Sequence, residues 1–334
     1  MRVSIVAMAM AAFGVLSASA QSPVPEEVIV YAQRNPEQVR TFVHSVAAVM
    51  PVGQLARWNE DICPGVVGAD QVQAQHIIDQ IAIRAMAVGL RVGRAGCRAN
   101  LTILVTGDAD TVAQVIYRER RLSLLNPNGV EGATLGEAAL RNFVDASRPV
   151  RWWYTARKTS DDGHVLTDRR AEPINARSSA AIAGASDVSA GGGGGMSAMG
   201  GVNAITNGMA STVGEGASGM QGVRSRGTRL SRATRHDFNT VLVIVDTNRL
   251  NGAPIVAVAD YIAFVSLAQV NPDAGNLPFP SILNLFSTQD PARRPEHMTD
   301  WDVDYLDGLY HATRAARNIG QQESEITQRM TTPH

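Results

Sequence analysis

The chain has 334 residues, 45 % of them hydrophobic, and its 30 basic residues almost balance its 31 acidic residues. This apolar content is sufficient for a folded core and excludes an acidic, aromatic-poor disordered chain. The charge balance lacks the basic excess of a nucleic-acid-binding protein, so we expect no nucleic-acid partner.

The first twenty residues have the features of a secretory signal peptide. Arg2 provides a positive start, residues 3–16 form a mainly apolar stretch, and the small side chains of 17–20 predict cleavage after Ala20. The later sequence has no uninterrupted apolar stretch of about 18 residues, so we expect no membrane span after cleavage. The sequence therefore predicts a periplasmic or extracellular protein.

Export determines how the two cysteines are interpreted. Cys63 and Cys97 both follow the signal peptide, and an oxidising compartment favours pairing of two such thiols. We therefore predict a Cys63–Cys97 disulfide. The alternative is a reactive thiol, which requires a second thiol or a histidine base close by, and the local sequence offers neither.

Apolar periodicity predicts helices and strands up to about residue 158. The pattern places strands at 27–32, 101–106 and 151–158, and helices from Pro36, over 70–88, from 107 to 120 and over 134–144. Helices and strands thus alternate irregularly, which is typical of an α+β protein rather than of a repeat.

The composition changes at residues 184–222, which are rich in glycine and nearly free of charge. Such a segment buries too little side chain to offset the entropy of ordering, so we predict a flexible insertion. A buried strand follows at 241–245. We predict an α+β fold with a mixed sheet packed with helices, in which 21–183 and 223–320 form one globular domain and 321–334 a tail. Two domains joined by the glycine-rich segment are the alternative.

The strand at 151–158 contains a candidate binding surface. With period-two alternation, Trp152 and Tyr154 face one side, while Arg151, Trp153 and Arg157 face the other. A tryptophan flanked by arginines suits stacking against a sugar or a nucleobase. The alternative is an ordinary strand with a half-covered tryptophan.

The segment 254–270 is apolar on nearly all sides, which predicts a helix buried in the interior. Asp260 is its one charged residue. A carboxylate in such surroundings either pairs with a cation or has its pKa raised by desolvation. Asp260 is therefore a candidate catalytic residue, and a structural arginine–aspartate pair is the alternative.

The segments Ser281–Phe286 and Met298–Tyr310 resemble the end of a matrixin-type metzincin catalytic domain, in which a zinc-binding helix precedes a methionine turn and a final helix. The resemblance implies a zincin-like scaffold. It also assigns each motif position to a residue of this chain: Ala259, Ala263 and Gln269 for the three histidines, Asp260 for the glutamate, Ser266 for the glycine and Leu283 for the turn's methionine. Two alanines cannot ligate zinc, so we expect no metal. The chain also resembles secreted proteobacterial proteins without an assigned activity, which implies a fold alone.

The closing helix is predicted independently of any family. Thr299 and Asp302 have the spacing of a capping box, and acidic residues suit a helix N-terminus. Calcium binding by Asp302, Asp304 and Asp307 is an alternative, but the glycine spacing of a calcium loop is absent. His297 and His311 flank this helix and are a weaker candidate for a metal-binding pair.

Motif chemistry gives little indication of catalysis. The sequence lacks the Gly-x-Ser-x-Gly, Walker, Cys-x-x-Cys and His-Glu-x-x-His motifs, so we expect no cofactor. The favoured function is a non-catalytic binding or envelope-associated module, with a cell-envelope polymer or protein as its partner. The alternatives are a secreted, peptidase-like hydrolase that uses Asp260 and a glycan-binding module that uses Trp153.

Overall fold

One mixed sheet forms the centre of the described part of the chain. The computed structural model describes residues 34–48, 53–125, 134–160, 163, 165–166, 232–287, 290 and 293–332. Its strands are β1 (Pro64–Val67), β2 (Leu101–Thr106), β3 (Val150–Ser160) and β4 (Thr234–Asp246), in the sheet order β1-β2-β4-β3. The first two strands and β4 are parallel, and β3 lies antiparallel to β4 at the edge. The predicted α+β class and mixed sheet are confirmed.

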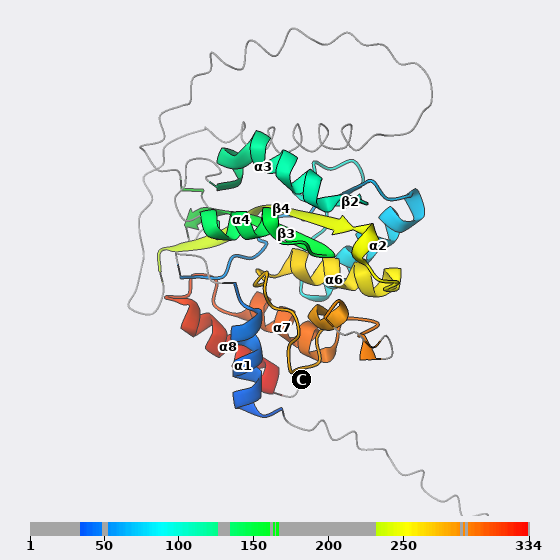
Figure 1. Ribbon diagram of the computed structural model, residues 1–334. Coiled ribbons are helices and arrows are strands. Elements are labelled where there is room, and N and C mark those ends of the chain that lie inside the picture. The colour runs from blue at the N-terminus through cyan, green and yellow to red at the C-terminus, as the bar shows by residue number, and fades with distance from the viewer. Residues whose placement is uncertain are drawn as a thin grey trace, which may run out of the picture. The chain divides into compact units, whose positions relative to one another are not determined.

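Helices cover both faces of this sheet (Figure 1). On one face lie α3 (Ala109–Leu125) and α4 (Glu137–Asp145), and on the other lie α2 (Gln71–Ala87) and α6 (Ile255–Leu267). Because successive side chains of a strand point to opposite faces, Trp152 and Tyr154 of β3 pack on the α6 side, and Trp153 packs on the α3 side. The predicted alternation of β3 is confirmed.

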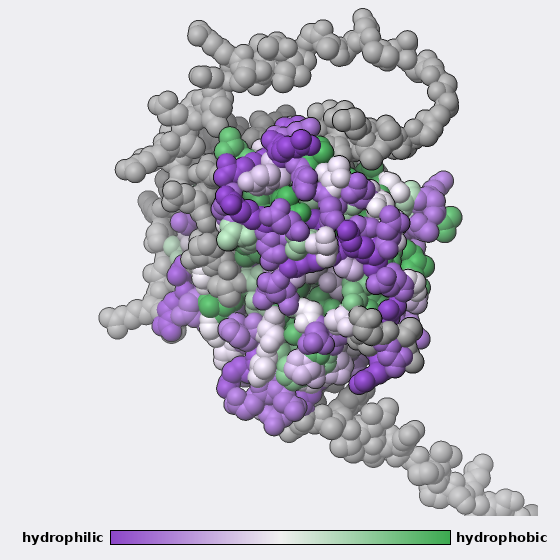
Figure 2. Space-filling view, in the orientation of Figure 1, coloured by the Kyte–Doolittle hydropathy of each residue, from purple (hydrophilic) through white to green (hydrophobic). Residues whose placement is uncertain are grey.

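A third layer lies beyond α6, away from the sheet (Figure 1). It consists of α1 (Pro36–Val46), α7 (Asp300–His311) and α8 (Ile319–Thr331). In the face shown in Figure 2, hydrophilic side chains gather over α3 and over α1 and α8. This distribution is typical of amphipathic helices whose inner faces are buried.

The C-terminal segment differs from its prediction. Residues 321–334 are predicted as a tail, but most of them lie in α8, which buries Gln322, Ile326 and Met330. Gly308 of α7 permits this close packing, since a Cβ there would lie 3.0 Å from Cγ2 of Ile326. The helix was not foreseen because its surface is mostly polar and its apolar positions are few.

Most other predicted elements are present with shifted ends. The predicted helix at 254–270 is α6, and β4 begins seven residues before the predicted strand at 241–245. The two 3₁₀ helices, η2 (Thr247–Arg249) and η3 (Ile282–Leu285), were not predicted. The signal peptide, the strand at 27–32 and the glycine-rich insertion at 184–222 lie outside the described residues.

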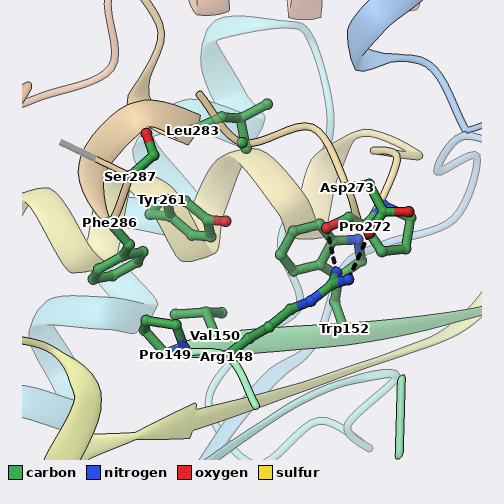
Figure 3. A pocket seen from close by; sticks show the side chains of 11 residues that line it. Arg148, Pro149, Val150, Trp152, Tyr261, Pro272, Asp273, Leu283, Phe286 and Ser287 are labelled. Atoms are coloured by element: carbon green, nitrogen blue, oxygen red, sulfur yellow. Dashed lines mark hydrogen bonds and ion pairs between the residues drawn. The ribbon is translucent and has the colours of Figure 1, made fainter. Parts of the chain in front are cut away.

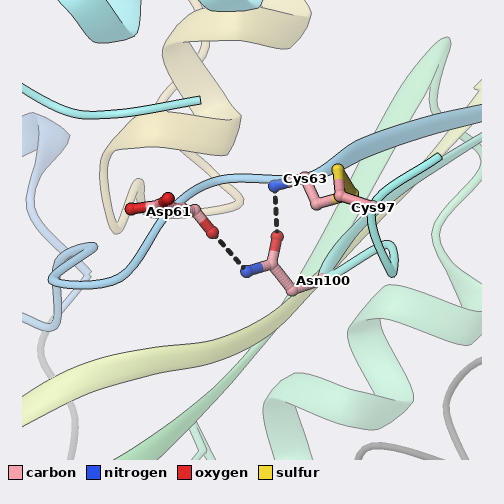
Figure 4. Close-up of a disulfide and its surroundings, with 4 residues drawn as sticks. All are labelled: Asp61, Cys63, Cys97 and Asn100. Atoms are coloured by element: carbon pink, nitrogen blue, oxygen red, sulfur yellow. Dashed lines mark hydrogen bonds between the residues drawn. A yellow bond between two sulfur atoms is a disulfide. The ribbon is translucent and has the colours of Figure 1, made fainter. Parts of the chain in front are cut away.

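The predicted disulfide is present and joins the chain just before β1 to the loop before β2 (Figure 4). The Cα atoms of Cys63 and Cys97 are 6.0 Å apart. Asn100 supports the bridge, because its Oδ1 accepts from the Cys63 amide (2.8 Å) and its Nδ2 donates to the Asp61 carbonyl (3.0 Å). None of the described helices combines the length and the apolar character needed to cross a membrane.

The packing of α8 gives a stability prediction. Ile326→Ala removes a fully buried side chain between α7 and α8, so we expect the free energy of unfolding to fall by about 2–5 kcal/mol. Ser324→Ala, an exposed position of the same helix, should change it by less than about 0.5 kcal/mol. Denaturant unfolding of both variants measures this difference, and equal effects would mean that α8 does not pack on the domain.

Candidate functional site

Helix α6 is the element on which the sequence candidates converge. It follows β4 after a turn in which Asn251 and Gly252 both adopt positive φ (51° and 71°), and Pro254 precedes its first residue. Every residue from Ala257 to Leu267 is buried. From Ala257 onward the helix therefore has no solvent-facing side on which a polar residue can be hydrated.

The C-terminal carbonyls of α6 receive side-chain donors. The last carbonyls of a helix lack intrahelical partners, and here they are inaccessible to solvent. Aromatic side chains from three separate segments supply the donors: the Tyr154 hydroxyl to the Val265 oxygen (2.7 Å), the Trp58 indole to the Ser266 oxygen (2.8 Å) and the Tyr310 hydroxyl to the Leu267 oxygen (2.6 Å). These bonds fix the end of α6 against the strand β3, the segment after α1, and α7.

The carboxylate of Asp260 is fully buried and bound on both oxygens. Oδ1 accepts from Nε of Arg84 (2.9 Å) and from Nε2 of Gln80 (2.8 Å). Oδ2 accepts from Nη2 of Arg84 (2.8 Å) and from the Met298 amide (2.8 Å). Nδ1 of His297 lies 3.7 Å from Oδ2 on an exposed side chain. Asp260 thus connects α6 to α2 and to the segment before α7.

The electrostatics of Asp260 favour its charged form. Burial raises the pKa of this carboxyl, but the hydrogen bonds from Arg84, the Met298 amide and Gln80, together with the positive charge of Arg84, hold the pKa below its usual value. A general acid needs the opposite, a carboxyl whose pKa lies near the working pH. The bidentate arginine pair is the geometry expected of a structural ion pair.

The positions that the metzincin resemblance assigns to zinc ligands are occupied by packed side chains. Ala259 and Ala263 are fully buried and have no donor atoms. Gln269 is also fully buried, and its side-chain amide accepts from the Ala56 amide (2.6 Å) and donates to the Ala48 carbonyl (2.5 Å). Within the described residues, no three histidine, cysteine, aspartate or glutamate side chains lie close enough to hold a metal ion.

The acidic residues near α7 do not converge on one point. Asp302 is buried and forms the predicted capping box with Thr299, and its carboxylate also accepts from the Ser281 hydroxyl (2.6 Å). Asp304 pairs with Arg34 (2.5 Å), and Asp307 pairs with Arg329. The histidines are equally separate, since His297 faces Asp260 and His311 lies 3.0 Å from Asp307.

The candidate binding surface on β3 is covered. Trp153 is 2 % exposed, its indole donates to the Leu124 carbonyl (3.0 Å), and its ring packs near Phe143. Arg151 is buried beside it and pairs with Asp110 of α3, while Arg157 pairs with Glu60. Because α3 and α4 cover this face of β3, Trp153 presents no ring face for stacking. The amphipathic patterns of α3 and α4 are the sequence feature that could have indicated this covering.

A pocket of about 300 Å³, which the sequence did not predict, lies between β3 and α6 (Figure 3). We call it the β3–α6 pocket. Trp152 of β3, Tyr261 of α6 and Phe286 after η3 supply aromatic walls, and Arg148 and Asp273 lie at its polar side. The sequence feature that could have indicated this pocket is the alternation of β3, which places Trp152 on the face of the sheet opposite Trp153.

No protein-family model, curated protein or solved structure matches this chain. Its function must therefore be inferred from the geometry of these residues.

The Asp260 ion pair gives a second stability prediction. Asp260→Asn leaves Arg84 without its anionic partner in a mostly buried setting, so we expect the free energy of unfolding to fall by about 3 kcal/mol. Asp61→Asn is the matched control, because the Asp61–Arg91 pair is exposed and such pairs contribute less than about 1 kcal/mol.

The same pair predicts a pH dependence. The pKa of Asp260 is lowered in the folded protein, so its stabilisation is complete above the unfolded value of about 3.9 and is lost as the pH falls through the folded value. The stability difference between wild type and Asp260→Asn should be constant near neutral pH and narrow below about pH 4. Chemical denaturation across this range tests the idea, and a difference that widens in acid would contradict it.

Proposed function

We propose that this protein is an exported, non-catalytic binding module on a degenerate zincin-like scaffold. One observation carries the proposal: the side chains at the ligand positions of the resemblance, Ala259, Ala263 and Gln269, are all fully buried. The first two have no atoms that bind zinc, and the third is used to hold the chain at Ala48 and Ala56.

The order of elements supports the proposed scaffold. The buried helix α6 follows directly from a sheet strand, η3 with the buried Leu283 packs beneath it, and α7 opens with the Thr299–Asp302 capping box. This is the sequence of helix, turn and final helix on which the metzincin resemblance is based. The scaffold supplies a reason for a fully buried helix to carry a single carboxylate at position 260.

The bonding of Asp260 argues for the non-catalytic interpretation. Its carboxylate oxygens already accept four hydrogen bonds of 2.8–2.9 Å, and the lowered pKa keeps the group ionised. A hydrolase that used Asp260 as an acid or base would need an oxygen free to reach a substrate. The covered ring of Trp153 likewise argues against a glycan-binding role at that residue.

Two features support export. The signal-peptide pattern ends at Ala20, and the Cys63–Cys97 disulfide is the kind of bond that persists in oxidising compartments. A periplasmic or extracellular site also gives the module access to a cell-envelope polymer or protein.

Metal analysis tests the proposed function. The chain from Gln21 onward, produced by export and dialysed without chelator, should retain far less than one zinc ion per molecule, because the buried helix lacks ligands. Its thermal unfolding midpoint should also be the same with and without a chelator. A known zinc peptidase treated in parallel is the control, and stoichiometric zinc that a chelator removes with loss of stability would refute the proposal.

A further inference from the structure

We propose that the β3–α6 pocket binds a neutral, single-ring small molecule that carries one oxygen function, such as a phenol. This inference rests on the proposed binding function and adds a small-molecule ligand to the envelope polymer or protein proposed as the partner. The pocket is lined by Tyr261, which follows Asp260 in α6, and by none of the residues at the ligand positions of the resemblance.

The size of the pocket limits the ligand. Its volume of about 300 Å³ lies at the lower end of the range for small-molecule sites, which extends to about 1,000 Å³. One ring fits such a space. The walls formed by Val150, Trp152, Leu283 and Phe286 are apolar, so transfer of a ring from water into the pocket is favourable.

The aromatic walls stand in a geometry that suits a further ring. Tyr261 contacts Phe286 edge-to-face, with ring centroids 5.0 Å apart, and Trp152 with centroids 6.0 Å apart. Edge-to-face arrangements expose ring faces and edges of opposite partial charge, to which another aromatic ring is attracted.

The Tyr261 hydroxyl is the hydrogen-bonding group that the pocket leaves available. Tyr261 is only 7 % exposed, and its hydroxyl has no hydrogen-bond partner among the described residues. Figure 3 shows this oxygen directed from the Tyr261 ring toward the side of the pocket where Trp152 lies. The Tyr261 hydroxyl is not among the fully buried atoms that lack a partner, so it opens to the pocket, where a ligand oxygen could replace water as its hydrogen-bond partner.

The other polar groups of the pocket are already bonded. The Trp152 indole donates to the Val270 carbonyl (3.1 Å), and the Ser287 hydroxyl donates to the Asn284 carbonyl (3.1 Å). Arg148 pairs with Asp273 (2.6 Å), which neutralises its charge (Figure 3). A charged ligand would therefore lack a counter-ion, which favours a neutral ligand.

Titration with p-cresol, followed by the tryptophan indole resonances in ¹H–¹⁵N NMR spectra, tests the proposal. The chain has four tryptophans, and the Trp152 resonance should shift saturably at millimolar p-cresol. Trp153 is the internal control, because it lies on the opposite face of β3, and its resonance should not move. The proposal is overturned if the Trp152 resonance does not respond to p-cresol.

A pair of tyrosine variants tests the role of the hydroxyl. Tyr261→Phe keeps the ring and removes one hydrogen bond, so p-cresol should bind about tenfold more weakly, while toluene, which has no oxygen, should bind as to wild type. The Tyr117 hydroxyl donates to Glu137, and Tyr117 packs on the opposite face of the sheet from Trp152, so Tyr117→Phe should bind both probes normally. Unchanged p-cresol affinity in Tyr261→Phe would refute the assigned hydroxyl.

Two further outcomes separate this inference from the proposed function. If N-acetyl-tyrosine amide shifts Trp152 and p-cresol does not, the occupant is a peptide side chain and the small-molecule assignment fails. Retention of zinc would refute the non-catalytic scaffold without affecting the NMR titration, and a silent titration would leave the metal result standing.

Discussion

The structure depends on helix α6, which has no polar side and is buried at every residue from Ala257 to Leu267. Burial of α6 removes its backbone carbonyls and its one carboxylate from water, and each unpaired group would cost free energy. The fold therefore brings donors to them from distant parts of the chain. Arg84 and Gln80 of α2 reach Asp260, while Tyr154 and Tyr310 reach the carbonyls at the end of the helix.

The same requirement explains the layer beyond α6. Hydrogen bonds hold the segment after α1 against the end of α6. The Gln269 side chain bonds to the backbone of Ala48 and Ala56, and the Trp58 indole donates to the Ser266 carbonyl. Arg57, in that segment, donates to the carbonyls of Leu309 and Ala312 at the end of α7, and burial lowers its pKa to about 10. A buried cation that caps helix carbonyls takes the place of water there. Polar side chains thus determine where the outer helices dock.

The sequence predicted features that depend on local pattern, and it missed features that depend on tertiary contacts. Period two placed Trp152 and Trp153 on opposite faces of β3, and the Thr299–Asp302 spacing predicted the capping box. The pattern could not reveal that α3 and α4 cover Trp153, nor that Arg84, among many arginines, is the partner of Asp260. Strand β1 was missed because its four residues are all half-buried and show no alternation.

The β3–α6 pocket follows from the geometry of one helix. Successive side chains on an α-helix point about 100° apart, so neighbouring residues serve different surroundings. Asp260 faces α2 and is saturated by hydrogen bonds, whereas Tyr261 faces β3 and keeps an unpaired hydroxyl at the pocket. The helix packs closely at the buried alanines Ala259 and Ala263 and still borders a cavity at Tyr261. For this reason we place the proposed binding function at Tyr261 rather than at Asp260.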